Sequence, residues 1–127
     1  MNNPAPGFKK YPKHSVTTEP AKQHVRVLFK GDVIADSKDA VALHESMSSD
    51  HVVGPVVYYI PRKDVKMDRL VRSSHKTHCP FKGDASYFSI GDEKDAVWSY
   101  EQPYDELMPI RELLAFYPDK FSIEARR

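Results

Sequence analysis

The stretch Thr77–Ile90, THCPFKGDASYFSI, holds the only cysteine of the chain, Cys79. A reactive thiol needs a lowered pKa, which a nearby cation, a histidine or a helix N-terminus can supply. Lys82 follows three residues later and His78 comes directly before, so the local chain offers both a cation and an imidazole. Free cysteine is also among the most buried residue types. Cys79 therefore fits either a reactive thiol or a small packed residue at the start of a strand.

Lys82 and Gly83 form a second candidate, because a backbone bend with an ammonium at its edge suits a phosphate or carboxylate group. The stretch lacks the GxxxxGK[ST] spacing of a P-loop, so no nucleotide motif supports it, and an exposed turn lysine is the alternative. Glu45 ends the otherwise apolar run AVALHE and is either a surface charge or a buried acid able to transfer protons. If Glu45 lies buried beside Lys82, the pair becomes the best catalytic candidate.

Aromatic residues recur in three of the expected strands. Because side chains alternate along a strand, Trp98 and Tyr100 share one face, whereas Tyr58 and Tyr59 point to opposite faces. Such rings form either a packed core or a groove whose hydroxyl and indole N–H groups contact a small molecule. The predicted ligand-binding residues are Tyr59, Lys82, Tyr87, Trp98 and Tyr100, and the catalytic candidates are Cys79, Glu45 and Lys82.

A metal site is the remaining chemical possibility. Its candidate ligands are His75, His78 and Cys79, with His44, His51 or Glu45 to complete the set. Tetrahedral zinc needs convergent ligands, and neighbouring residues of an extended chain point to opposite faces. We therefore predict no metal and no cofactor.

Composition limits the classes of function. The chain has 127 residues, enough for one domain with a core of its own. Its 19 basic and 18 acidic residues leave a net charge of +1, which predicts neither a nucleic-acid partner nor an anionic membrane as partner. No apolar run reaches the length of a membrane span, and the lone cysteine suits a reducing compartment. We expect a cytoplasmic protein, without a prediction of its oligomeric state.

The pattern along the chain predicts a small β-rich domain. Residues 1–20, rich in proline, are expected to be a flexible tail with a short docked strand near residues 14–18, and residues 21–127 form the single domain. Strands are predicted in HVRVLF and VIADS as a hairpin, in AVALHE, in PVVYYIP, in ASYFSI and AVWSY as a second hairpin, and on both sides of the PD turn in LAFYPDKFSIEA. RKDVKMDRLVRS is expected to be a short helical turn or an irregular connection, and Pro109 denies ELMPIRELL a full helix.

About seven or eight short strands with little helix predict two antiparallel sheets, arranged as a sandwich, an open barrel or two sheets meeting at an angle. A parallel α/β fold is disfavoured because no long amphipathic helices are present to cover a parallel sheet.

An ordered series of pieces covers nearly the whole chain: HSVTTEP, VRVLFKGDVIADS, Glu45, VVYYIPRKDV, THCPFKGDASYFSI, DAVWSYEQP and AFYPDKFSI. In this series the chain resembles domain-of-unknown-function family 427. The resemblance implies a compact, mainly β fold of the Mss4-like or β-tent type, two antiparallel sheets leaning on each other, and it implies no activity. Relatives of that fold often hold a structural zinc between two CxxC knuckles, which a chain with one cysteine cannot build.

Two functions follow as expectations. The first is a polar and aromatic pocket for a small anionic or carbonyl-containing ligand, lined by Glu45, Tyr59, Cys79, Lys82, Tyr87 and Trp98. If the ligand is turned over, Cys79 or Glu45 is the reactive group and Lys82 stabilises developing negative charge. The second is a protein or peptide interaction module that uses edge strands or the tail. A concave pocket holding both Cys79 and Lys82 would favour the first.

Overall fold

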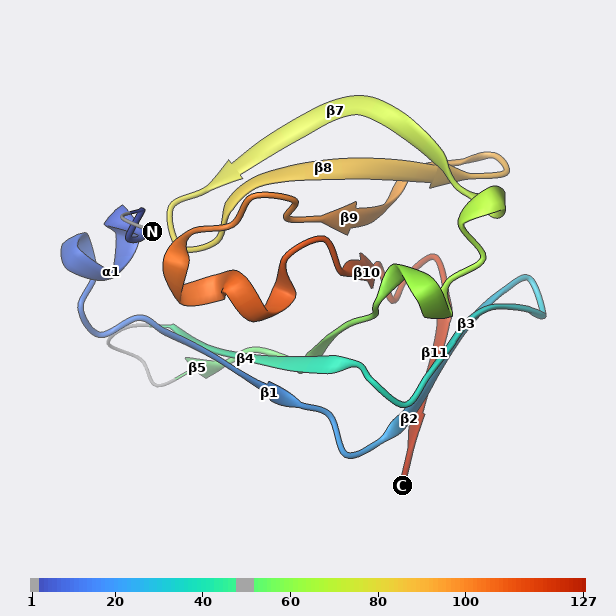
Figure 1. Ribbon diagram of the computed structural model, residues 1–127, viewed down its shortest axis with the longest axis horizontal. Helices are drawn as coiled ribbons and strands as arrows, with labels where there is room; N and C mark the ends of the chain where they lie inside the picture. The colour runs from blue at the N-terminus through green and yellow to red at the C-terminus, as the bar shows by residue number, and fades with distance from the viewer. Residues whose placement is uncertain (1–2, 48–51) are drawn as a thin grey trace.

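The computed structural model describes residues 3–47 and 52–127 (Figure 1). The strands are β1 (Ser15–Pro20), β2 (His24–Phe29), β3 (Asp32–Ser37), β4 (Val41–Met47), β5 (Val52–Val53), β6 (Val57–Tyr59), β7 (Val71–Cys79), β8 (Gly83–Ile90), β9 (Glu93–Ser99), β10 (Leu114–Phe116) and β11 (Ser122–Arg126). The helical pieces are α1 (Pro6–Lys10) and the short 3₁₀ turns η2 (Arg62–Asp64), η3 (Met67–Arg69) and η4 (Asp105–Ile110). The expected mainly β domain with little helix is confirmed.

The strands of the described residues form three antiparallel sheets. In the first sheet β4 pairs with β1 on one side and with β5 and β6 on the other. The second has the order β10-β9-β8-β7, and the third has the order β11-β2-β3. In Figure 1 the strands β7, β8 and β9 lie above, β1 and β4 lie below, and η4 and β10 lie between these layers.

The third sheet is a difference from the two sheets expected. The β1–β4 ladder ends at Pro20 opposite Val41, and the backbone N–H of Ala21 donates to the carbonyl of Ala40 before the β2–β3 ladder begins. The same two chain segments therefore continue from the β1–β4 pairing into the β2–β3 pairing. The third sheet is thus a bent continuation of the first, joined by β11.

Strand β7 is a long strand that the sequence pattern did not predict. Almost all of its side chains are exposed, so it shows no alternation of apolar and polar residues. Both predicted hairpins are confirmed by the β2–β3 and β8–β9 pairings, and Pro109 lies in the short turn η4 instead of a full helix. The stretch RKDVKMDRLVRS opens as predicted with short helical turns, η2 and η3, but its last residues already belong to β7. The finer assignment to the Mss4-like or β-tent type stays a prediction.

The N-terminal segment is placed on the body of the domain. Strand β1 pairs with β4, Gly7 donates its N–H to the Pro80 carbonyl, and the N–H of Ala5 donates to Glu106. A side chain at position 7 would meet the Phe81 ring at 2.7 Å, so glycine permits this close approach. The expected boundary at residue 20, with a flexible tail before it, stays a prediction.

Two groups of buried side chains fill the spaces around the second sheet. The first cluster contains chiefly aliphatic and phenylalanine side chains, among them Val25, Val27, Ile34, Ile60, Phe88, Val97, Leu114 and Phe116. The second cluster contains Leu43, Tyr59, Ala85, Tyr87, Tyr100, Leu107, Ile110 and Ala115, with Cys79 and Trp98 packed at its border. Neighbouring residues of one strand divide between the clusters, as the predicted alternation of Tyr58 and Tyr59 requires. The second sheet therefore buries parts of both its faces.

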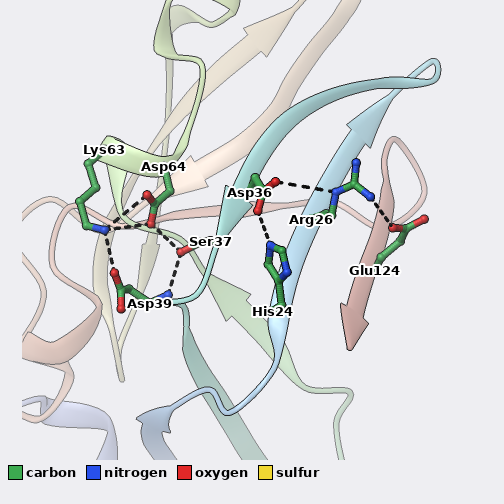
Figure 2. Close-up of polar contacts among 8 residues, drawn as sticks. All are labelled: His24, Arg26, Asp36, Ser37, Asp39, Lys63, Asp64 and Glu124. Carbon is green, nitrogen blue, oxygen red and sulfur yellow. Dashed lines mark hydrogen bonds and ion pairs between the residues drawn. The ribbon is translucent and has the colours of Figure 1, made fainter. Parts of the chain in front are cut away.

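The outer face of the third sheet carries ion pairs between side chains on paired strands, as Figure 2 shows. Arg26 of β2 lies opposite Asp36 of β3 and Glu124 of β11, with N–O distances of 3.9 and 3.6 Å. His24 also pairs with Asp36. Pairs that water reaches in this way contribute little to stability, and we regard this face as a solvated sheet surface.

Candidate functional site

Three charged or titratable side chains meet at the end of the molecule where the β7–β8 turn approaches β4. The Lys82 ammonium donates to Glu45 Oε1 at 2.9 Å, and His14 Nε2 lies 2.7 Å from Glu45 Oε2. The side chains are 13% exposed for Lys82, 21% for Glu45 and 8% for His14. Glu45 thus lies partly buried beside Lys82, the condition under which the pair was to be the best catalytic candidate, and a histidine just before β1 joins them.

The backbone around Lys82 is fixed from several sides. Gly83 has φ +116°, a value that side chains disfavour, and a Cβ there would lie 3.3 Å from the Gln102 carbonyl. The Lys82 carbonyl accepts a hydrogen bond from the N–H of Tyr104. The His14 ring stacks on Phe81, next to Lys82, with 3.8 Å between ring centroids. The turn thus holds the ammonium against β4.

Glu45 lies on the face of β4 that also carries buried Leu43, so its carboxylate is directed between the first two sheets. Partial burial raises the pKa of this carboxyl, but the hydrogen bonds and charges of Lys82 and His14 outweigh that effect and lower the pKa. Glu45 is consequently ionised at neutral pH, and both its oxygens are engaged. It suits the positioning of Lys82 better than proton transfer, for which a pKa near neutrality is favourable.

Two buried tyrosines lie near this ion pair. Burial is the main cause that raises the pKa of both Tyr59 and Tyr100, and the neighbouring charge of Glu45 adds to it. Trp98 donates its indole N–H to the Tyr59 hydroxyl at 3.2 Å. Both phenols therefore remain protonated and able to donate a hydrogen bond.

The Tyr100 hydroxyl differs from that of Tyr59. It makes no hydrogen bond to any described residue, although no fully buried polar side-chain atom in the described part of the chain lacks a partner. Among the described residues its hydrogen-bonding capacity is therefore unused.

Cys79 is half-buried and packs against the second cluster. Its neighbour His78 points the other way and pairs with Asp84 at 2.7 Å, as the alternation along an extended strand predicts. The thiol thus shares the inner face with Tyr59 and Tyr100. Neither Cys79 nor Lys82 lines any of five surface hollows found among the described residues, and the pocket expected to hold both is not seen in them.

The remaining predicted ligand-binding residues extend away from the ion pair. Tyr87 hydrogen-bonds Thr77 Oγ1 at 2.8 Å, and the Trp98 ring contacts Tyr117 with centroids 4.4 Å apart. The predicted residues therefore lie along one face of the second sheet, with Glu45 and Lys82 at one end and Tyr87 towards the other. Ligand binding by these residues stays a prediction.

Sequence reasoning missed His14 and Tyr117. His14 opens the stretch HSVTTEP, and Tyr117 lies in AFYPDKFSI. Both stretches already carried the family resemblance, but neither residue has a neighbour in sequence that suggests chemistry.

The candidate metal ligands do not converge. Among the described residues no three histidine, cysteine or acidic side chains are placed to hold one ion, and His51 lies outside the described residues. The Nε2 atom of His44 instead lies 4.0 Å from Oε1 of Glu19.

No described helix is long and apolar enough to cross a membrane.

Comparison with protein families identifies a family for most of the chain. Residues 17–127 match the family described as a domain of unknown function (DUF427), as the resemblance in sequence implied. Comparison with curated proteins gives no match. The matched region begins after His14 and includes Glu45, Lys82 and every other predicted site residue. Since it covers most of the 127 residues, the chain belongs to the DUF427 family.

Proposed function

We propose that the protein binds a small anionic or carbonyl-containing ligand beside Lys82, at the border of the second cluster. The observation that carries the proposal is the Lys82–Glu45 pair, held at 2.9 Å next to protonated tyrosine hydroxyls. An ammonium has three donor hydrogens, and Glu45 takes one of them. The other two suit a carboxylate, phosphate or carbonyl oxygen.

The tyrosines favour the same class of ligand. The Tyr100 hydroxyl has no partner among the described side chains and is a free donor for a ligand oxygen. Protonated hydroxyls and a half-buried ammonium in apolar surroundings bind an anion more strongly than the same groups in water. The aromatic rings of the second cluster supply the apolar walls that small-molecule sites commonly have.

The N-terminal segment controls access in this proposal. Phe8 of α1 packs against the second cluster, and His14 covers the second oxygen of Glu45. A ligand that contacts both Lys82 and Tyr100 requires this segment to shift. If the ligand is turned over, Cys79 is the candidate nucleophile and Lys82 is the group that would stabilise negative charge.

A cytoplasmic location remains part of the proposal.

Calorimetric titration with a panel of small probes tests the proposal. Acetate, pyruvate and inorganic phosphate represent the anionic and carbonyl classes, and 2-propanol is the neutral control. We expect at least one anionic probe to bind, and Lys82→Met to weaken it about tenfold or more, because a charge-assisted hydrogen bond is lost. Lys66→Met removes an equal charge from an exposed position and should leave binding unchanged. Equal loss in both variants, or no binding of any anion, would contradict the proposal.

An interaction module is the second candidate, favoured by β7, which lies at the edge of its sheet with most side chains exposed. Its pairing with β8 shifts register between Arg72 and Lys76, and both residues are basic. Bulges and basic residues on edges discourage the addition of another strand. The ligand site is therefore the better supported proposal.

A further inference from the structure

A hollow of about 270 Å³ lies at the end of the second cluster away from the Lys82–Glu45 pair. Its aromatic and charged lining residues are His75, Tyr87, Asp95, Tyr117, Asp119 and Lys120. They come from β7, β8, β9 and the turn after β10, so the tertiary fold brings them together.

Aromatic rings form the walls of the hollow, and their positions are fixed by contacts. The rings of His75 and Tyr87 lie 4.6 Å apart between centroids, and the Tyr87 hydroxyl is bonded to Thr77. Tyr117 is half-buried and packs on Trp98 at 4.4 Å. The negative faces of such rings attract cations.

The charges of the hollow are predominantly negative. Asp95 and Asp119 make no ion pair with any residue that the structure describes, whereas the lining Lys120 pairs with Glu93 at 3.2 Å. The lining therefore carries two carboxylates and one ammonium, and that ammonium already pairs with Glu93. Burial and hydrogen bonding with Tyr87, followed by the charges of Asp119 and Asp95, raise the pKa of Tyr117 to about 12, in keeping with this negative environment.

The backbone holds Asp95 in an uncommon conformation. Its φ is +54°, which is rare for a residue with a side chain, and the β8–β9 register shifts between Phe88 and Ile90. The Asp95 N–H donates to Ser89 Oγ at 2.9 Å, so a side-chain oxygen takes the place of a backbone carbonyl as its acceptor. Irregularities of this kind redirect a side chain relative to a regular strand.

We propose that this hollow binds a small organic cation, an alkylated or quaternary ammonium group, between the Tyr87 and Tyr117 rings and the Asp95 and Asp119 carboxylates. Aromatic faces with nearby carboxylates complement such a cation in both shape and charge. The opposite charge of its ligand separates this site from the Lys82 site, and the inference does not depend on the proposed function.

Trp98 offers a direct readout, because it is the only tryptophan of the chain and contacts Tyr117. The full chain is titrated at about pH 8, where an ordinary imidazole is neutral. Tetramethylammonium is the probe, and tert-butanol is the neutral molecule of similar shape. We expect a saturable change in Trp98 fluorescence with tetramethylammonium and none with tert-butanol at equal concentration.

Matched variants locate the binding. The double variant Asp95→Asn/Asp119→Asn should weaken tetramethylammonium binding about tenfold, since both attractive charges are lost. Asp68→Asn removes a charge from an exposed position outside the hollow and should leave the affinity unchanged. Nuclear magnetic resonance shifts should show that Tyr117→Phe, which keeps the ring, retains binding and that Tyr117→Leu loses it. Equal response to tert-butanol, native affinity in the double variant, or an equal loss in Asp68→Asn would overturn the inference.

Discussion

The two buried clusters differ in what their side chains carry. The first contains aliphatic and phenylalanine side chains, which have no polar atoms to satisfy. The second contains three tyrosines, borders a tryptophan and a cysteine, and lies beside a partly buried ion pair. Apolar packing contributes stability directly, whereas buried polar groups contribute little unless their hydrogen bonds are complete. We expect the first cluster mainly to maintain the fold, and we place the proposed ligand site at the second.

The largest effect is expected in the first cluster. Ile34 is fully buried, so Ile34→Ala should lower the free energy of unfolding by about 2–5 kcal/mol through lost burial and a residual cavity. Urea denaturation measures this change. Val56→Ala, at a position that is 41% exposed, is the control and should change stability by less than about 0.5 kcal/mol. A similarly small loss of stability at both positions would contradict the role of the first cluster in maintaining the fold.

A smaller effect is expected where the N-terminal segment contacts the β7–β8 turn. In Gly7→Ala the new Cβ would lie 2.7 Å from the Phe81 ring and 2.9 Å from the Pro80 carbonyl, so α1 must move away. We expect a loss of about 1–3 kcal/mol from this overpacking. Faster modification of Cys79 by a thiol reagent should accompany it, because α1 covers the second cluster. Unchanged stability and unchanged thiol reactivity would show that the segment does not cover this region.

The polar character of the second cluster can be tested at Tyr59. Tyr59→Phe keeps the ring but leaves the indole N–H of Trp98 without its acceptor, so we expect a loss of about 1–2 kcal/mol. Tyr58→Phe is the matched control on the same strand, since Tyr58 packs against the first cluster. Chemical denaturation of both variants should separate them, and equal losses would contradict the distinction between the two clusters.

The smallest effect concerns an ion-pair group outside both clusters. Hydrogen bonds from Arg72 and then Arg62 lower the pKa of Glu101 to about 2 from an ordinary 4.5, against the opposing effect of burial. Because the folded-state pKa is lowered, this stabilisation is present above about pH 4.5 and is lost as the pH falls towards 2. Glu101→Gln should flatten the fall in stability over this range by about 1 kcal/mol, since water screens the pair. If the free energy of unfolding has the same pH dependence in the native protein and in Glu101→Gln, the stabilising role of this ion pair is contradicted.

Much of the fold could be predicted because local alternation determines it. The hairpins around Gly31 and Gly91 follow from apolar alternation on both sides of a turn. Strand β7 could not be predicted in this way, because its exposed polar side chains carry no period and its pairing with β8 fixes it. The bend that separates the third sheet from the first likewise depends on contacts between distant segments.

The residue types of the candidate site could be predicted from the sequence, but their arrangement in space could not. Glu45 and Lys82 were singled out by residue type and considered as a pair, but their contact follows from the approach of the β7–β8 turn to β4. His14 and Tyr117 acquire their roles only from neighbours that are distant in sequence, Glu45 and Phe81 for the first and Trp98 for the second. A single sequence contains no local signal for such partners.

The modification rate of Cys79 tests the central claim most directly, because this is the only thiol of the chain and it borders the second cluster. The rate is measured with a thiol reagent, with and without the anionic probe that binds most tightly in the calorimetric panel. The probe should slow modification in the native protein and in Lys66→Met, and it should give no protection in Lys82→Met. A rate that is the same with and without the bound probe would contradict the placement of the ligand beside Lys82.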